Sequence, residues 1–397
     1  MTADAAPTLH LRVLLLSPVE GVDVQCGDTT YTATLLDHPA PGVEYVAYPD
    51  AIAVGDLVEL DRRRRNPRAF RTRRRREFPA VAFTALLNRL RGRGPLFREP
   101  VRLFAVRPGA FDAIHLHVVS AAFYGPCPPI VASAASSLPY LYRHAFGWRG
   151  LRLQIAERIE RVLAAVLRGN APLSHFTNVS RLVCYSLEEA RMYPVARHFL
   201  ATDRLDVISL PVDTTNLTRS PAADAVNFGF IAKDFEARGG PMILDAFEIC
   251  RRTLGPARLS VVGSEAGDER ANVLWMGQIE RARLLTDVLP GIDIAVWASR
   301  LNGISYSLAE AAGSGCALVL PAHPPLIEEF GTEAAEWFEP GSVDDLARAM
   351  TSAAVPARRQ ELSERAVAVF RLRFAADAVA RQLQASYLRA VTESAQR

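Results

Sequence analysis

The chain has 397 residues, 49% of them hydrophobic, and a formal net charge of only +3. This length predicts two or three domains with cores of their own, and so small a net charge gives no general reason to expect a nucleic-acid partner. The five scattered cysteines include no CxxC pair, which argues against a disulfide framework and a zinc site and favours a reducing, cytoplasmic compartment.

The first residues contain a short apolar run without a basic region before it. This pattern is typical of a first strand rather than of a signal peptide. No apolar run approaches the roughly 20 residues that a membrane-spanning helix needs. We therefore expect a cytoplasmic protein, with peripheral attachment to the cytoplasmic face of a membrane as the alternative.

Short apolar, β-branched runs alternate with helical patterns along the chain. Runs of this kind suit parallel strands that are covered on both faces, and the alternation indicates βαβ units. The expected strands are 11–17, 43–48, 113–119, 129–132, 181–185 and 207–210 in the first half, and 226–232, 258–263, 273–277, 292–297, 316–321 and 335–338 in the second. Two such sets predict an α/β protein with two doubly wound, Rossmann-like domains that face a cleft.

The domain boundary is expected at 209–224, a stretch rich in Pro, Ser, Thr and Asp without a sustained period. The expected division is an N-terminal domain over 1–210, a linker over 211–225, a second domain over 226–374 and a C-terminal helix over 375–397 that packs on either domain, including back on the first. The apolar face of that helix comprises Val379, Leu383, Tyr387, Leu388 and Val391.

An arginine-rich insertion interrupts the N-terminal domain near 50–105. Its segment Arg62–Arg76 reads RRRRNPRAFRTRRRR and precedes an apolar run over 78–90 that arginines bracket. One interpretation is a solvated loop, and the other is a surface that binds anionic membrane lipids. We expect no nucleic acid there, because the sequence lacks an aromatic-interleaved basic strand of the RNA-recognition type.

The segment FGFIAKDFEARGG at 228–240 contains Lys233, the only lysine of the chain. Lys233 and Arg238 follow an expected strand and precede a Gly-Gly pair and a helix, and cations in this position are well placed to bind phosphate. The alternative is a surface ion pair between Lys233 and Asp234 or Glu236.

A second motif, ASRLNGISYSLAEAAGSG, begins at 298 and contains Asn302 and Glu310. The turn that starts at Gly303 opens a helix, so its backbone amides are suited to an anionic group. Glu310 lies between Leu308 and a run of small residues, which predicts a half-buried carboxylate rather than an ordinary surface glutamate.

In order and spacing, these segments resemble the C-terminal half of the retaining GT-B glycosyltransferases of family 4, which use nucleotide sugars. The family binds the donor diphosphate with an arginine and a lysine, and Lys233 and Arg238 stand at those positions with the two identities exchanged. The resemblance implies that Glu310 accepts hydrogen bonds from the ribose. It also implies that Asn302, which replaces a family glutamate, faces the donor sugar.

The N-terminal half resembles the same family more loosely. Gly27 falls on the glycine loop near the donor phosphates, although many members have Gly-Gly where this chain has Cys-Gly. FDAIHLHVVS matches the family's Asp-x-x-His-x-His stretch, and His117 aligns with the histidine that contacts the donor sugar. His115 has a core interpretation, because alternate strand residues share a face and the run is apolar.

The resemblance implies transfer of a hexose from a UDP or GDP sugar to a glycan, lipid-linked glycan or metabolite, with retention of configuration and without a metal or other cofactor. Lys233 and Arg238 would stabilise the leaving diphosphate. The residues expected in catalysis are His117, Lys233, Arg238 and Glu310, and those expected to bind the donor are Gly27, Asp28, Gly263, Ser264, Gln278, Asn302, Gly303, Ile304, Ser305 and Glu310.

Three alternatives stay open at this point. Asn302 in place of a glutamate suits a catalytically impaired nucleotide-sugar-binding protein or a subunit that activates a partner. An enzyme of another class on the same scaffold is a second alternative, although a pyridoxal-dependent phosphorylase would need Lys233 for its Schiff base, and the end of a strand is an improbable place for one. A nucleic-acid-binding protein that acts through Arg62–Arg76 is the third.

Overall fold

The computed structural model describes residues 10–17, 27–59, 102–117, 121–123, 125–133, 150–151, 154, 179–192, 202–213, 225–265, 267, 270–299 and 304–396. The arginine-rich segment Arg62–Arg76 and most of the expected linker lie outside these residues. The chain divides into two compact units, one of Met1–Tyr185, Glu189–Ile208 and Ala380–Arg397 and the other of Ser186–Glu188 and Ser209–Val379.

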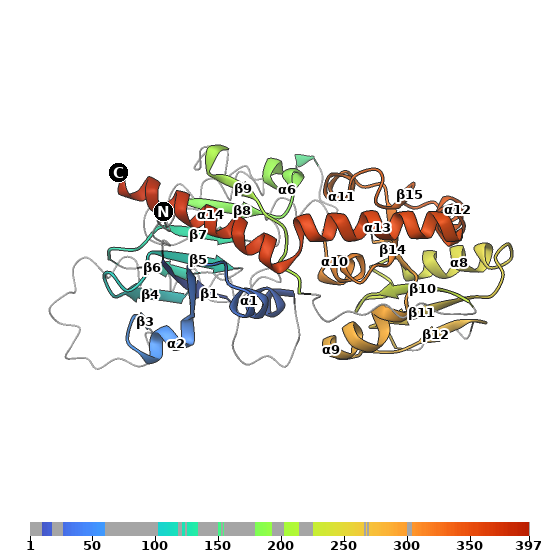
Figure 1. Cartoon of the computed structure of the whole chain (residues 1–397), viewed down its shortest axis with the longest axis horizontal. Helices are drawn as coiled ribbons and strands as arrows, with labels where there is room; N and C mark the ends of the chain where they lie inside the picture. Colours follow the sequence, from blue (N-terminus) through green and yellow to red (C-terminus); the bar gives the residue numbers. More distant parts are fainter. Residues whose placement is uncertain are drawn as a thin grey trace, which may run out of the picture. The chain divides into compact units, whose positions relative to one another are not determined.

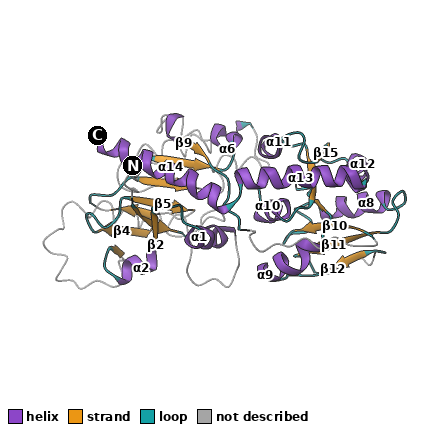
Figure 2. Cartoon of the chain, viewed as in Figure 1, coloured by secondary structure: helices purple, strands orange, loops and turns teal. Residues whose placement is uncertain are grey.

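The first unit contains a six-stranded sheet in which every neighbouring pair is parallel (Figures 1 and 2). In spatial order the strands are β2 (Val43–Ala47), β1 (Leu11–Leu16), β5 (Ala113–His117), β7 (Ile130–Ser133), β8 (Arg181–Cys184) and β9 (Leu205–Val207). Strands β5, β7 and β8 are buried at every position, which is why their sequences are mostly apolar.

The two faces of the first sheet have different partners. Leu14, Ile114 and Leu116 share a core with helix α2 (Tyr48–Ala53) and with Phe104. On the opposite face, helix α1 (Gly27–Asp37) brings Tyr31 onto His117, and helix α14 (Ala376–Ala395) brings Tyr387 onto His115. Helix α6 (Leu187–Met192) and the 3₁₀ turn Thr202–Arg204 complete the described helices of this region.

A three-stranded sheet also belongs to the first unit. It consists of β3 (Leu57–Glu59), β4 (Arg102–Val106) and β6 (Ala121–Phe123), with β3 antiparallel and β6 parallel to β4. None of these strands was predicted. Two of them have only three residues, too few to produce a period. The strand expected over 207–210 was placed too late, because Ile208–Leu210 are buried but follow the end of β9.

The second unit holds another six-stranded, all-parallel sheet. Its order is β12 (Val273–Trp275), β11 (Ala257–Val262), β10 (Val226–Ile231), β13 (Ile294–Val296), β14 (Ala317–Pro321) and β15 (Glu336–Phe338). With two parallel sheets in two Rossmann-like domains, the predicted α/β fold class is confirmed.

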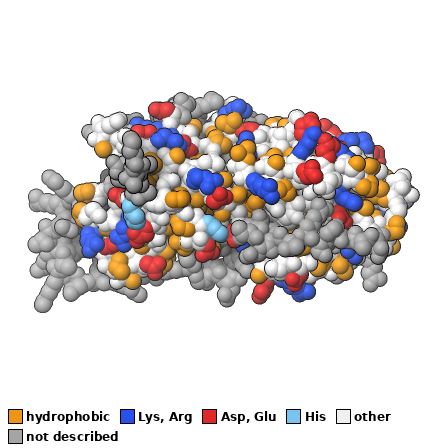
Figure 3. Space-filling model, in the orientation of Figure 1, with side chains coloured by type: hydrophobic (Ala, Val, Ile, Leu, Met, Phe, Trp, Pro, Cys, Tyr) orange, Lys and Arg blue, Asp and Glu red, His pale blue; other side chains and the backbone are white. Residues whose placement is uncertain are grey.

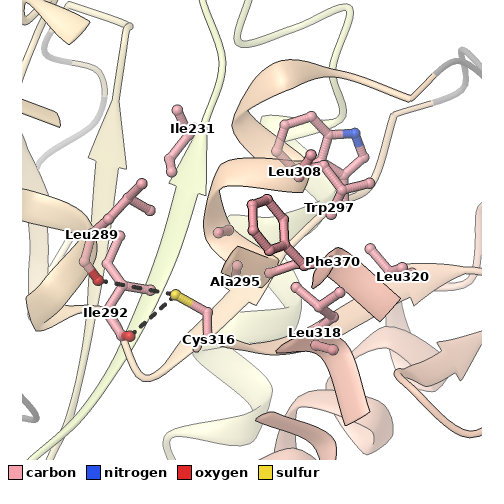
Figure 4. Packing of buried hydrophobic residues seen from close by; sticks show 14 of the residues in the cluster. Ile231, Leu289, Ile292, Ala295, Trp297, Leu308, Cys316, Leu318, Leu320 and Phe370 are labelled. Atoms are coloured by element: carbon pink, nitrogen blue, oxygen red, sulfur yellow. Dashed lines mark hydrogen bonds between the residues drawn. The ribbon is translucent and has the colours of Figure 1, made fainter. Parts of the chain in front are cut away.

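Helices cover both faces of the second sheet. Phe228 and Phe230 pack with α8 (Gly240–Cys250) and α12 (Val343–Ala354) on one face. Ile231 and Trp297 pack on the other with α10 (Tyr306–Gly313), α11 (Pro324–Phe330) and α13 (Pro356–Arg373), as Figure 4 shows in part. A short helix α9 (Arg281–Arg283), a π-helical turn over Leu284–Val288 and a 3₁₀ turn over Leu289–Gly291 lead into β13. Successive strand residues thus alternate between two apolar layers.

Helix α14 buries most of the face that its period predicts, but toward its C-terminus the buried face is shifted around the helix. Val379, Leu383 and Tyr387 are fully buried, whereas Leu388 and Val391 are only half-buried. Ser386 is buried instead, because its hydroxyl donates to Asp206 at 2.6 Å. On the face of the molecule in Figure 3, acidic and basic side chains are interspersed, as the small net charge leads one to expect. No helix of the described residues is both long and apolar enough to cross a membrane.

Candidate functional site

The order of the second sheet defines where a ligand can bind. From β10 the chain proceeds to β11 and β12 on one side, and then returns to β13, β14 and β15 on the other. The reversal falls between β10 and β13. Loops that leave neighbouring strands in opposite directions open a crevice at the carboxyl ends of those strands. The loops over 232–239 and 297–299 flank this point, and the first of them contains both predicted cations.

The loop after β10 is anchored by Phe235. Its ring lies 5.9 Å from that of Phe230 and 5.1 Å from that of Trp275, measured between centroids. A turn then forms, in which the backbone N–H of Ala237 donates to the Asp234 carboxylate at 3.1 Å. With its middle held in the core, the loop exposes Lys233 at one end and holds Arg238 half-buried at the other.

Gly239 and Gly240 let this loop approach the loop after β13. Gly239 has φ +83°, and a Cβ atom there would lie 2.4 Å from the carbonyl oxygen of Ala298. At Gly240 a Cβ atom would lie 2.3 Å from the ring of Phe235. Only glycine tolerates both the backbone conformation and the contact. The approach brings Nη1 of Arg238 to 3.4 Å from Oγ of the buried Ser299.

Arg238 is a partly buried cation with little compensation. Burial lowers its pKa, and attraction to Asp234 opposes that effect, but a guanidinium stays charged at neutral pH. Among the described residues, its side chain makes only the long hydrogen bond to Ser299, although a guanidinium carries five N–H donors. Within the described part of the chain, the side chain therefore has donors left for an anionic group at the reversal of the sheet.

Glu310 is more deeply buried than its sequence predicted. Helix α10 begins after Ser305, whose hydroxyl caps it by accepting from the N–H of Leu308 at 3.2 Å, and Glu310 one turn later is only 2% exposed. Nε of Arg281, from α9, donates to Oε1 of Glu310 at 2.7 Å. Burial raises the pKa of Glu310, and Arg281 opposes that rise.

Arg281 was missed in the sequence. It lies three residues after the predicted Gln278, but one arginine among 46 lysine and arginine residues is not a distinctive signal. The only indication was its position at the start of a helix that follows a predicted loop of the site.

The remaining predicted residues of the second unit lie on neighbouring loops. The N–H of Gly263 donates to the carbonyl of Gly277 at 2.7 Å, and the hydroxyl of Ser264 donates to the carbonyl of Ala232 at 3.0 Å. These two bonds tie together the loops after β10, β11 and β12. Gln278 is exposed beside them, and Ile304 is half-buried before α10. Asn302 and Gly303 lie outside the described residues.

His117 belongs to the first unit, where the strand order reverses between β1 and β5. It ends β5 and is 1% exposed. Its ring stacks on that of Tyr31, with 3.8 Å between centroids and 5° between planes, and its Nδ1 lies 2.9 Å from Oγ of Ser133. Gly27 and Asp28 begin α1, and only their backbone is described.

The described residues include no group of three or more His, Cys, Asp or Glu side chains that could hold a metal ion. In the second unit, the loops that follow the parallel strands contain two cations, Lys233 and Arg238. These loops also lead to the N-termini of α8 and α10, and α10 contains the deeply buried carboxylate of Glu310. Such an edge is suited to a phosphate-bearing ligand.

Solved structures that share this fold include enzymes of sugar transfer. Sucrose-phosphate synthase from Thermosynechococcus elongatus aligns with a TM-score of 0.57 at 13% identity over 97% of this chain and 100% of its own. A glycosyltransferase from Rickettsia africae gives 0.56 at 10% identity over 96% and 99%. HepE of Anabaena, solved with UDP-glucose, gives 0.53 at 10% identity over 95% and 99%.

The chain has the fold of these glycosyltransferases. At such low identity, the likeness establishes the fold alone. No protein-family description matches the sequence, and no curated protein matches it. The glycosyltransferase fold agrees with the two-domain GT-B architecture that the motifs around Lys233 and Glu310 implied.

Proposed function

We propose that this protein is a retaining glycosyltransferase of the family-4 type, which transfers a hexose from a nucleoside diphosphate sugar to an acceptor hydroxyl. The observation that carries the proposal is Arg238, a half-buried guanidinium at the reversal of the second sheet, where the close approach at Gly239 holds it. Among the described residues its side chain makes only one long hydrogen bond. The glycosyltransferase fold of the whole chain supports it, and so does the second cation, Lys233, on the same loop.

The chemistry needs a site that stabilises a leaving diphosphate. When the bond between the anomeric carbon and the phosphate oxygen breaks, negative charge develops on the diphosphate. Fixed cations at that position stabilise the transition state more than the ground state. Arg238 supplies a planar, bidentate donor and Lys233 a point charge. The N-termini of α8 and α10 add partial positive charge at the same edge of the sheet.

Glu310 is suited to the ribose of the nucleotide. Its Oε1 accepts from Arg281, and in this proposal its Oε2 accepts from the ribose hydroxyls. The loops with Gly263, Ser264 and Gln278 then hold the base, and Ile304 and Ser305 adjoin the diphosphate. The HepE complex contains UDP-glucose, which favours UDP over GDP as the nucleotide here.

Retention of configuration needs no side chain that attacks the sugar. In the proposed step the acceptor oxygen forms its bond to the anomeric carbon on the face that the diphosphate leaves. The acceptor proton passes to a phosphate oxygen of the departing nucleotide. The acceptor is a glycan, a lipid-linked glycan or a metabolite, and an anionic membrane surface is the proposed partner of Arg62–Arg76.

The deciding experiment is thermal denaturation of the protein with UDP, GDP, ADP or TDP. The expected result is stabilisation by one nucleotide, about 2.7 kcal/mol at a hundredfold excess over its dissociation constant. Arg238→Ala and Lys233→Ala should each reduce it. Arg252→Ala is the matched control, because this exposed arginine follows the far end of helix α8. Absence of stabilisation by every nucleotide would overturn the proposal.

A donor screen then separates transfer from binding. The matching nucleotide sugars are incubated with the protein and candidate acceptors, and the anomeric configuration of the product is read by NMR. Product with inverted configuration would refute the retaining mechanism. Nucleotide binding without turnover of any sugar would instead favour a catalytically impaired binding protein, the alternative that Asn302 suggests.

A further inference from the structure

A hydrogen-bonded chain of buried hydroxyl and imidazole side chains extends through the first unit, from the C-terminal helix α14 to His117. The Tyr387 hydroxyl of α14 lies 3.1 Å from the Tyr45 hydroxyl and also contacts Nδ1 of His115. Nε2 of His115 lies 2.8 Å from Oγ of Ser133, and this same oxygen lies 2.9 Å from Nδ1 of His117. Tyr387, His115, Ser133 and His117 are each at most 1% exposed.

Burial keeps the ring of His115 uncharged at neutral pH, because it lowers the pKa of this residue to about 3. A neutral imidazole has one N–H donor and one acceptor nitrogen. The proton of His115 is therefore on one nitrogen or the other, and its two neighbours, Tyr387 and Ser133, must complement that choice.

Counting hydrogens restricts the arrangement. Ser133 has a single hydroxyl hydrogen but meets an imidazole nitrogen on each side, so it can donate to only one of them. Tyr387 also has one, and a phenol is a better donor than acceptor toward imidazole nitrogen. If Tyr387 donates to Nδ1 of His115, Nε2 of His115 carries the hydrogen and donates to Ser133.

The rest of the order follows from that first bond. Ser133 accepts from His115 and donates to Nδ1 of His117, so the hydrogen of His117 must be on Nε2. Tyr45 in turn donates to the oxygen of Tyr387. In this order Tyr387, His115 and Ser133 each donate a hydrogen bond and accept one, which suits their buried environment.

Two further hydroxyls lie beside the chain at longer distances. The Tyr31 hydroxyl is 3.4 Å from Nε2 of His115, and the Tyr185 hydroxyl is 3.4 Å from Nδ1 of His117. Both are longer than the contacts of the imidazoles with Ser133. Tyr31 also forms a side-chain hydrogen bond with Ser133. In the order above, Ser133 has no second hydrogen to give, so Tyr31 is the donor of that bond. The ring of Tyr31 stacks on His117 and fixes the plane of its imidazole.

We propose that Tyr387 is a positioning residue, which acts through His115 and Ser133 to hold His117 in the tautomer with its hydrogen on Nε2. His117 then presents a hydrogen-bond donor, suited to a hydroxyl or phosphate oxygen of a ligand, instead of an acceptor. A helix 272 positions along the chain from His115 thereby sets the chemistry of a residue at the reversal of the first sheet.

The test is NMR of the full-length protein with ¹⁵N-labelled histidine, which distinguishes protonated from unprotonated ring nitrogens. His115→Asn and His117→Asn variants assign the two rings. In the wild type we expect hydrogen on Nε2 of both. Tyr387→Phe keeps the buried ring but removes the hydroxyl, so His117 should become a mixture of tautomers. Tyr45→Phe is the control, since Tyr387 keeps its donor and the tautomer should not change.

Two results would overturn the proposal. One is a wild-type His117 with its hydrogen on Nδ1, and the other is a Tyr387→Phe protein, folded by its melting temperature, in which His117 keeps the wild-type tautomer. An activity measurement rests on the proposed function and is separate. With an identified donor, Tyr387→Phe should lower kcat at least about tenfold, with the nucleotide affinity unchanged. If no donor is turned over, the tautomer result still decides.

Discussion

The guanidinium of Arg281 donates from Nε to the buried carboxylate of Glu310 across 2.7 Å, and so joins helix α9 to helix α10. Arg281 itself is partly exposed, with 29% of its side chain accessible, whereas only 3% of the Glu310 side chain is. The pair is therefore asymmetric. Glu310 depends on Arg281 for compensation of its charge more than Arg281 depends on Glu310.

Replacement of Arg281 by alanine should lower the free energy of unfolding by about 2 kcal/mol at pH 7, because it leaves a buried carboxylate uncompensated. The loss should shrink as the pH falls. Burial already raises the pKa of Glu310 above its ordinary 4.5, and removal of the opposing arginine raises it further. A buried carboxylate whose folded pKa is raised does not destabilise the fold below its ordinary pKa of 4.5. It destabilises the fold as the pH rises through the folded pKa.

Urea denaturation of wild type and Arg281→Ala between pH 7 and pH 5 measures this difference. Arg283→Ala provides the control, because Arg283 is two positions away on the same helix but 65% exposed, with an ion pair at 3.7 Å to an exposed Asp287. Its loss should be within about 0.5 kcal/mol. A loss in Arg281→Ala that is the same at every pH would contradict the account of Glu310.

Gly239→Ala should destabilise the second unit by about 2 kcal/mol. Alanine at φ +83° is strained, and its Cβ atom would lie 2.4 Å from a backbone oxygen, which cannot move as a flexible side chain can. Gly255→Ala is the control, since nothing lies within 4 Å of a Cβ atom there and its φ is not in the left-handed region. That substitution should be neutral or slightly stabilising. Chemical denaturation compares the two, and equal effects would show that the contact with Ala298 is unimportant.

How far the sequence predicts this structure depends on the range of the interactions. Apart from the misplaced β9, the strands of the two six-stranded sheets were predictable, because a strand buried on both faces is mostly apolar along its length, as in β14 (ALVLP). The cations of the loop after β10 were also predictable, since they occur in one short motif. The partners of Glu310 and His115 were not. Arg281 is 29 positions from Glu310 and Tyr387 is 272 from His115, and no local period connects them.

His115 is a second case in which the local sequence does not contain the deciding information. A histidine in an apolar strand has a core interpretation and a site interpretation, and the strand alone does not decide between them. The structure shows that His115 is buried, as the core interpretation expects, but that both of its ring nitrogens have hydrogen-bond partners. The deciding information is in the hydroxyls of Tyr387 and Ser133, which only the folded arrangement brings to it.

Asp206 joins helix α14 to the first sheet and provides the last prediction. Its carboxylate accepts from Arg181 at 2.8 and 3.0 Å, from Ser386 at 2.6 Å and from Arg389 at 2.7 Å. Burial acts to raise its pKa, but the hydrogen bonds from Arg181 and Ser386 and the attraction of both arginines outweigh burial, so the pKa lies below 3.8. Arg181 is itself only 3% exposed.

Asp206→Asn should therefore lower the free energy of unfolding by about 3 kcal/mol at pH 7, because it leaves the buried Arg181 with less compensation. The stability that the charged carboxylate provides is present above its unfolded pKa and is lost as the pH falls through its lower folded pKa. The difference between wild type and variant should thus stay constant from pH 7 to pH 5 and narrow only below 3.8. Asp245→Asn, an exposed partner of Arg270, should cost less than about 1 kcal/mol. A difference for Asp206→Asn that narrows already between pH 7 and pH 5 would mean that the arginines do not hold this carboxylate in its charged form.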